Sequence, residues 1–108
     1  MIDNLDMGKK KVALVTGSSS GIGYETALLL ARNGFDTFAT MRNMNKSKEI
    51  TEVSKREKLP LRVIQLDVND DKSVSDAINN ILKEKKSIEV LVNNAGYGLM
   101  GSVEDSSL

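Results

Sequence analysis

The sequence lacks two residue types on which much protein chemistry depends. Its 108 residues contain no cysteine and no histidine. Without cysteine the chain can form no disulfide and offers no thiol nucleophile or iron–sulfur ligand. Without histidine it has no imidazole general base and lacks the commonest zinc ligand. Thiol catalysis, imidazole catalysis and most zinc sites are therefore excluded.

Aromatic residues and net charge are also scarce. The chain has two tyrosines, two phenylalanines and no tryptophan, and fifteen basic residues balance fifteen acidic ones. This composition disfavours a nucleic-acid surface, which needs basic charge and stacking rings. The longest wholly apolar run, Ala27–Ala31, is far too short to span a bilayer. We expect a cytoplasmic protein with neither a nucleic-acid nor a membrane partner.

Short apolar runs alternate with amphipathic stretches along the chain, which is typical of an α/β fold with a parallel sheet. The pattern predicts strands at Lys11–Thr16, Phe35–Thr40, Leu61–Leu66 and Ile88–Val92, and helices at Ile22–Asn33, Lys46–Lys58 and Asn69–Lys85. In the first helix, the expected apolar stripe is Ile22, Ala27, Leu28, Leu30 and Ala31. Asn69 is expected to cap the last helix, with Asp70 and Asp71 at its positive end.

Right-handed crossovers predict the strand order 3-2-1-4, with the helix Asn69–Lys85 on the opposite face of the sheet from the other two. The strand order reverses between the first and fourth strands. At that switch point the loops Gly17–Gly23 and Asn93–Gly96 should meet, beyond the carboxyl ends of the strands, where open α/β sheets bind ligands. Residues 1–8 are expected to form a loose leader, and residues 9–108 part of one domain.

The loop after the first strand carries the main chemical signal, Thr-Gly-Ser-Ser-Ser-Gly-Ile-Gly over residues 16–23. Gly17 permits a turn, Gly21 lets the backbone approach a diphosphate at the helix N-terminus, and Gly23 allows close packing of the helix on the strand. The serines add hydroxyl donors. The alternative is a tight turn with no ligand.

Arg42 lies where a dinucleotide fold selective for the unphosphorylated cofactor places an acidic residue, about 20 residues past the glycine loop. Met41 and Arg42 stand there instead, and an arginine at that edge can pair with a 2′-phosphate. The alternative is an exposed arginine at the start of a loop.

Polar residues also end the third and fourth strands. Asp67 and Val68 lie near the expected adenine position, although Asp67 could equally serve the entry of the next helix near Asn69. Asn93 and Asn94 end a buried strand, so their amides must bond either neighbouring backbone or a ligand.

Together, Thr16-Gly17-(x)3-Gly21-Ile22-Gly23, Asp67-Val68 and Asn93-Asn94-Ala95-Gly96 resemble the short-chain dehydrogenase/reductase family in order and spacing. The resemblance implies a Rossmann-like NAD(P)-binding domain, truncated after the fourth strand. It implies NADP(H) as preferred cofactor, with NAD(H) as the other option, although Ser20 stands where many NADP-binding members carry a basic residue. The cofactor-binding residues it implies are Gly17, Ser19, Ser20, Gly21, Ile22, Gly23, Arg42, Asp67, Val68, Asn94, Ala95 and Gly96.

The family's catalytic Ser and Tyr-(x)3-Lys have no counterpart in the chain. Tyr24 and Tyr97 are the only tyrosines, and Leu28 and Gly101 stand four residues after them. Tyr24 is expected to face outward from its helix. The resemblance therefore implies the N-terminal part of an oxidoreductase acting on a carbonyl or alcohol such as a retinoid or steroid, with catalytic residues beyond Leu108. The parent protein would be a homo-oligomer, and this chain alone would be inactive. The alternatives are a non-catalytic dinucleotide sensor and a truncated interaction module.

Overall fold

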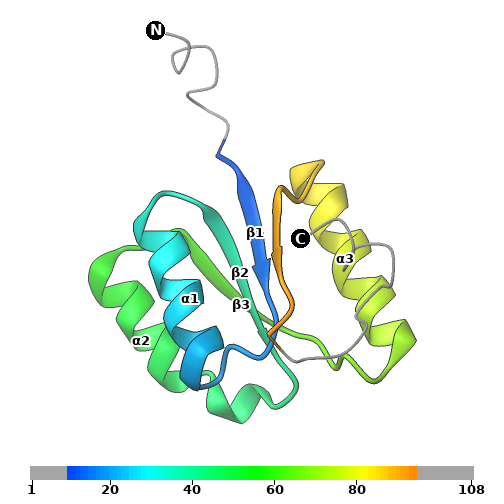
Figure 1. Ribbon diagram of the computed structural model, residues 1–108, viewed down its shortest axis with the longest axis horizontal. Coiled ribbons are helices and arrows are strands. Elements are labelled where there is room, and N and C mark those ends of the chain that lie inside the picture. The colour runs from blue at the N-terminus through cyan, green and yellow to red at the C-terminus, as the bar shows by residue number, and fades with distance from the viewer. Residues whose placement is uncertain (1–9, 95–108) are drawn as a thin grey trace, which may run out of the picture.

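The computed structural model describes residues 10–94, in which four strands alternate with three α-helices (Figure 1). The strands are β1 (Val12–Val15), β2 (Asp36–Met41), β3 (Leu61–Gln65) and β4 (Val90–Val92). The helices are α1 (Gly21–Arg32), α2 (Lys48–Glu57) and α3 (Asp71–Lys85), and the short 3-10 helix η2 (Met44–Lys46) lies between β2 and α2. The leader predicted at residues 1–8 lies outside the described residues.

The strands form one parallel sheet in the order β3-β2-β1-β4, as predicted. In the register, Ala13 of β1 lies between Thr37 of β2 and Val90 of β4. Because all strands run the same way, the loops that follow β1, β2, β3 and β4 all leave from one end of the sheet.

The helices cover the two faces as expected, with α1 and α2 on one side and α3 on the other (Figure 1). Alternate residues of β1 supply the two cores: Val15 packs in the cluster under α1 and α2, whereas Leu14 packs in the cluster under α3. The first cluster contains Val15, Ala27, Leu28, Ala39, Met41 and Ile50. The second cluster contains Val12, Leu14, Phe38 and Ile81, and a neighbouring one contains Leu66, Val74 and Ala77.

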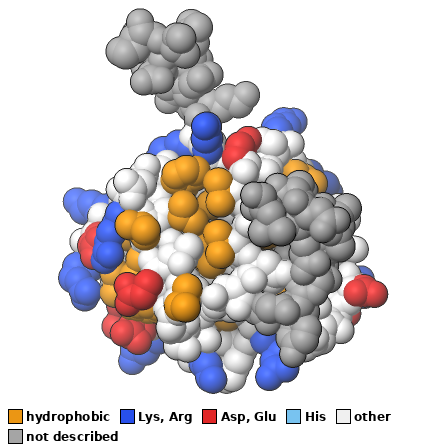
Figure 2. All heavy atoms as spheres, in the orientation of Figure 1, with side chains coloured by type: hydrophobic (Ala, Val, Ile, Leu, Met, Phe, Trp, Pro, Cys, Tyr) orange, Lys and Arg blue, Asp and Glu red, His pale blue; other side chains and the backbone are white. Residues whose placement is uncertain are grey.

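Burial differs between the central strand and its last neighbour. Every residue of β1 is at most 3% exposed, whereas all three residues of β4 are only half-buried. The predicted strand Ile88–Val92 is shorter in the structure. Just before it, the Glu89 N–H donates to the Val12 carbonyl at 2.9 Å, and the Glu89 carboxylate accepts the Val12 N–H at 2.7 Å. On the face shown in Figure 2, hydrophobic side chains gather between α1 and β4.

The prediction that Asn69 caps α3 is wrong. The N-cap is Asp70, whose Oδ1 accepts from the backbone N–H of Lys72 at 3.0 Å and of Ser73 at 3.4 Å. Asn69 instead donates its own backbone N–H to Asp67. A carboxylate is the better acceptor for the partly positive N–H groups of a first turn, which explains the choice.

Two predictions on α1 are also wrong. Ile22 is 74% exposed and does not belong to the apolar stripe, whose buried members in α1 include Ala27, Leu28 and Ala31. Tyr24 does not face outward: it is half-buried against the cluster under α1 and α2. Burial and the nearby Glu49 carboxylate raise the pKa of the Tyr24 phenol.

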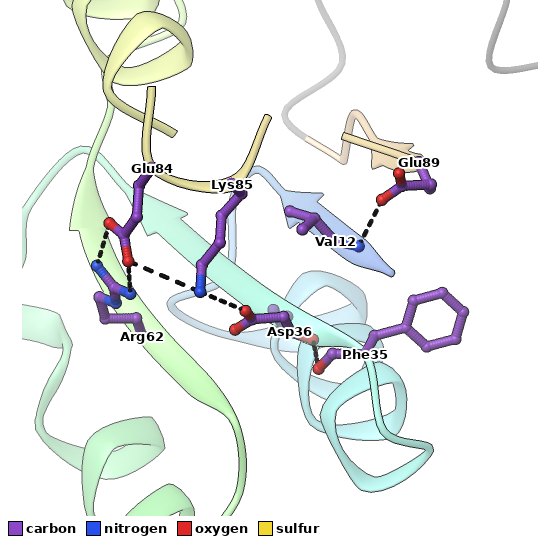
Figure 3. Close-up of polar contacts among 8 residues, drawn as sticks. Val12, Phe35, Asp36, Arg62, Glu84, Lys85 and Glu89 are labelled. Carbon is purple, nitrogen blue, oxygen red and sulfur yellow. Dashed lines mark hydrogen bonds and ion pairs between the residues drawn. The ribbon is translucent and has the colours of Figure 1, made fainter. Parts of the chain in front are cut away.

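At the amino end of the sheet, ion pairs attach the last turn of α3 to β2 and β3 (Figure 3). Arg62 donates twice to Glu84, at 3.0 and 2.6 Å, and its guanidinium lies 5.0 Å from the centre of the Phe38 ring. Lys85 reaches Asp36 at 2.7 Å. The hydrogen bond from Arg62 lowers the pKa of Glu84, and the hydrogen bond to Asp36 raises that of Lys85.

Candidate functional site

The loops after β1 and β4 meet at the carboxyl end of the sheet, as the strand order predicts. The Asn94 side-chain amide donates to the carbonyl of Gly17 at 3.3 Å, and the Thr16 hydroxyl lies 3.2 Å from Oδ1 of Asn93. These bonds give both asparagines structural partners, and this role does not exclude contact with a cofactor. Ala95 and Gly96, also predicted to contact a cofactor, lie outside the described residues.

Three glycines shape this junction for different reasons. Gly17 and Gly21 adopt left-handed backbone conformations, with φ of 63° and 64°, which other residues adopt only at a cost. A Cβ added at Gly21 would meet no atom within 4 Å, so the space beside it is open. A Cβ at Gly23 would lie 2.1 Å from the Gly17 carbonyl oxygen and 2.8 Å from Nδ2 of Asn94. The close packing predicted at Gly23 therefore exists. It brings α1 against the loop that follows β1.

The N-terminus of α1 lies beside the open space at Gly21. Ser20 is the N-cap in extended conformation, and its side chain makes no capping hydrogen bond. No acidic residue lies in the first turn, and Ser20, Gly21 and Ile22 are exposed. The N–H groups of the first turn and the helix dipole therefore favour an anion at this position.

Buried hydroxyl groups fix the base of the glycine loop. The Ser18 N–H donates to the carbonyl of Thr40 at 2.9 Å, joining the loop to the end of β2. The hydroxyls of Ser18 and Thr40 both donate to the carbonyl of Val15, at 2.9 and 3.2 Å. Neither residue was predicted to have this role; the only sequence signal is a small hydroxyl residue at the end of an apolar strand.

Beside Gly17, a hollow of about 240 Å³ lies across the ends of β1, β2 and β3. It brings together residues predicted from three separate motifs, and its lining consists of Gly17, Ser19, Met41, Arg42, Leu66, Asp67, Val68 and Asn69. We call it the β2–β3 hollow.

Asp67 has a structural partner within this hollow. Its Oδ1 accepts the Asn69 N–H at 3.0 Å, while its own N–H donates to the Ser73 hydroxyl at 3.0 Å. These bonds hold Asp67 and Val68 in a fixed turn at the wall of the hollow, so the structural role does not remove the residues from the site. Sequence reasoning missed Ser73, whose contact spans six residues.

Arg42 follows β2 directly and is exposed at the edge of the hollow. Within residues 10–94 its guanidinium has no hydrogen bond or ion pair, whereas Arg32 pairs with Glu57 and Arg62 with Glu84. The positive charge of Arg42 is thus available to an external anion. Across the same described range, no cluster of acidic side chains could hold a metal ion, and no helix is long and apolar enough to cross a membrane.

Comparison with known proteins gives a family match over almost the whole chain. The family model of short chain dehydrogenase matches residues 11–108. Human retinol dehydrogenase 8 is 44% identical over 103 residues, covering 91% of this chain and 32% of that protein. Human 17-beta-hydroxysteroid dehydrogenase type 1 is 38% identical over 101 residues, covering 88% of this chain and 30% of that protein.

Solved structures agree with the fold. A variant of actinorhodin polyketide ketoreductase with NADPH superimposes with a TM-score of 0.74 at 28% identity, over 82% of this chain and 34% of that one. Menthone neomenthol reductase from Mentha piperita gives a TM-score of 0.71 at 32% identity, over 82% of this chain and 32% of that one. The chain therefore spans about a third of the length of the proteins it resembles.

Proposed function

The chain belongs to the short-chain dehydrogenase family, and we propose that it supplies the NADP(H)-binding half-site of an oxidoreductase. When bound, the nicotinamide cofactor would carry hydride to or from a carbonyl or alcohol carbon of a small-molecule substrate. The observation that carries the proposal is the junction at the carboxyl end of the sheet, where an open helix N-terminus, a hollow and an arginine whose guanidinium has no partner in the described range adjoin one another.

The diphosphate would lie at the first turn of α1. Gly21 has open space beside it, and the exposed Ser20 leaves the N–H groups of the turn without a side-chain cap. Ser19 and Ile22 would border the diphosphate and its ribose, and Gly23 would keep the helix close to the loop. The backbone donors are held in place before binding, so little ordering is required of them.

The adenosine would occupy the β2–β3 hollow. Asp67 could accept from the adenine amine while Val68 offers its backbone N–H, both from a turn fixed by Ser73. Arg42 at the edge of the hollow would pair with the 2′-phosphate, which is the basis for preferring NADP(H) over NAD(H). Asn94, Ala95 and Gly96 would contact the remaining ribose from the β4 side.

The reaction itself would need residues beyond this chain. A Ser and a Tyr-(x)3-Lys would follow Leu108 in a longer cytoplasmic, homo-oligomeric protein, with the lysine lowering the tyrosine pKa so that it can exchange a proton with the substrate oxygen. The similarity to dehydrogenases named for retinol and 17-beta-hydroxysteroids supports an alcohol or ketone on a largely apolar substrate.

Two measurements test this function. Titration of the full-length protein with NADPH and NADH, followed by nicotinamide fluorescence, should show tighter binding of NADPH. Oxidation of NADPH should then depend on an added ketone or aldehyde. Tight NADPH binding without turnover of any carbonyl in a broad panel would favour the alternative of a dinucleotide sensor. Failure to bind either dinucleotide would contradict the proposal.

Residues 1–108 alone should not turn over substrate. Residues 1–108 would also aggregate or melt without cooperativity, because the half-buried β4 has only β1 as a neighbour among the described strands. Gel filtration and a thermal melt check this. A monodisperse monomer with a cooperative melt would contradict the stability claim, and carbonyl-dependent NADPH oxidation would contradict the claim of inactivity.

A further inference from the structure

We infer that Gln65 is a positioning residue for cofactor choice, because its side chain fixes the backbone of Arg42 at the edge of the β2–β3 hollow. The inference rests on the proposed binding of NADP(H) at that hollow. It concerns a residue that is not among those lining the hollow and that reaches it only through Arg42.

Arg42 lies just beyond the end of β2. β2 pairs with β3 along its length, up to the register pair Met41 and Gln65. The Leu66 N–H then donates to the Met41 carbonyl at 3.0 Å, which is the last backbone bond of this pair. Arg42 follows Met41 outside the strand, so its peptide group has no place in the ladder of backbone hydrogen bonds.

The side chain of Gln65 replaces the missing ladder bond. Its Nε2 donates to the backbone carbonyl of Arg42 at 3.0 Å. On the amino-terminal side of Arg42, the bond from the Leu66 N–H to the Met41 carbonyl fixes the peptide that enters the residue. After Arg42, the Asn43 side chain accepts the N–H of Asn45 and caps η2. Arg42 is therefore a single exposed residue between a backbone bond at the Met41 carbonyl and the Gln65 bond at its own carbonyl, and both restrict the direction in which its side chain leaves the backbone.

This anchoring matters because Arg42 is otherwise free to reorient. An exposed arginine has several rotatable bonds, and ordering it on binding costs entropy. If the peptide after Arg42 is fixed, fewer backbone conformations must be lost when the guanidinium meets a 2′-phosphate. A ligand without the 2′-phosphate makes no use of this order, so the effect should appear in NADPH binding and not in NADH binding.

The identity of the side chain is also significant. Gln65 is neutral and presents a donor to the Arg42 carbonyl. A glutamate of nearly the same shape would present only acceptors to that carbonyl and would add a negative charge beside the expected phosphate. A methionine would keep the length of the side chain and remove the donor.

The test compares Gln65→Met and Gln65→Glu with wild type in the full-length protein. Asn80→Met is the matched control, because Asn80 and Gln65 line the same second hollow between β3 and α3, but Asn80 belongs to the helix. Dissociation constants are measured for NADPH and NADH by fluorescence, and for 2′,5′-ADP and 5′-AMP by displacement.

For Gln65→Met we expect NADPH and 2′,5′-ADP to bind about three- to tenfold more weakly, the range of one hydrogen bond, with NADH and 5′-AMP unchanged. Gln65→Glu should weaken the binding of NADPH and 2′,5′-ADP more than Gln65→Met does, because the glutamate carboxylate also repels the 2′-phosphate. Asn80→Met should change neither ratio.

Equal weakening of both cofactors, or no change, would show that Gln65 only stabilises the sheet edge and would overturn the inference. If wild type binds neither dinucleotide, the proposed function fails and this inference with it. If wild type binds NADPH and NADH equally well, the preference assigned to Arg42 fails. In that case the inference fails as well, because Gln65 acts only through Arg42, whereas NADPH binding at the hollow can still stand.

Discussion

At one end of the sheet the basic side chains pair with acidic ones, whereas at the other end an arginine side chain has no partner among the described residues. At the amino end, Arg62 and Glu84 pair with each other and Lys85 pairs with Asp36, so the last turn of α3 is attached to two strands. At the carboxyl end, the guanidinium of Arg42 has no hydrogen bond or ion pair within residues 10–94.

The difference distinguishes charged side chains that stabilise the fold from a charged side chain that is available to bind a ligand. Both ends carry basic residues on or next to the same strands, so the type of residue does not distinguish them. The carboxyl end differs because its fixed parts are backbone groups, held by buried hydroxyls such as those of Ser18 and Thr40. Backbone held in this way can present N–H groups and an unpaired side chain to a ligand.

The largest effect is expected for Gly23→Ala. Its new Cβ would lie 2.1 Å from the backbone oxygen of Gly17, which cannot move without distorting the loop. We expect a loss of about 3 kcal/mol or more, at or above the upper end of overpacking costs, together with loss of dinucleotide binding. Denaturant unfolding of the full-length protein checks this. A variant with wild-type stability would show that the junction is looser than described.

Gly21→Val should separate folding from binding. A side chain there meets no protein atom within 4 Å, but the φ of 64° imposes strain, of about 1–3 kcal/mol. The valine would also fill the space assigned to the diphosphate, so cofactor binding should be abolished.

Gly34→Val is the matched control for that change. Gly34 also has a left-handed φ, of 90°, and open space, but it follows the other end of α1. The two variants should melt similarly and differ in binding. Normal NADPH titration of Gly21→Val would mean that the loop is only a turn.

Arg42→Ala should weaken NADPH binding roughly ten- to a hundredfold, the value of a charge-assisted contact, and leave NADH nearly unaffected. Arg56→Ala, which removes an exposed arginine from α2, serves as the control. Arg42→Lys should recover part of the loss, because it keeps the charge without the planar fork. If NADPH and NADH weaken equally, Arg42 does not read the 2′-phosphate.

The smallest effect is expected at the amino end. The bond from Arg62 lowers the pKa of Glu84 in the folded state. The stability from this pair is therefore present above the ordinary glutamate pKa of about 4.3 and is lost as the pH falls through the lowered value.

In Glu84→Gln, thermal melts between neutral and acidic pH should show a weaker acid dependence, with NADPH and NADH binding unchanged at pH 7. Glu52→Gln, at an exposed carboxylate of α2, is the control. A change in cofactor selectivity from Glu84→Gln would break the proposed separation of the two ends.

The sequence predicted the strand order and the meeting of the two loops, because both follow from the alternation of buried strands and helices and from glycines at a strand end. It placed Arg42 after the second strand and Asp67 and Val68 after the third, and in the structure these residues line one hollow. Their cofactor contacts stay predictions. Errors arose where the local pattern allows more than one outcome. Asp70 caps α3 instead of Asn69, and Ile22 is exposed although it continues an apolar pattern.

Contacts that depend on the folded arrangement could not be predicted. Gln65 reaches a carbonyl 23 positions away, and Thr40 a carbonyl 25 positions away. Both are polar residues at the ends of strands, and nothing in the local pattern distinguishes them from polar residues that have no such bond. Their hydrogen-bond partners are determined by the register of neighbouring strands. The sequence pattern does not predict that register to within one residue.

The central claim is that the carboxyl end of the sheet binds NADP(H) through the first turn of α1 and Arg42. A crystal structure of the full-length protein with NADP⁺ tests it most directly. The account predicts the diphosphate against the backbone of residues 20–23, adenine in the β2–β3 hollow, and the 2′-phosphate within hydrogen-bond distance of the Arg42 guanidinium. A cofactor bound elsewhere, or a 2′-phosphate that points away from Arg42, would contradict it.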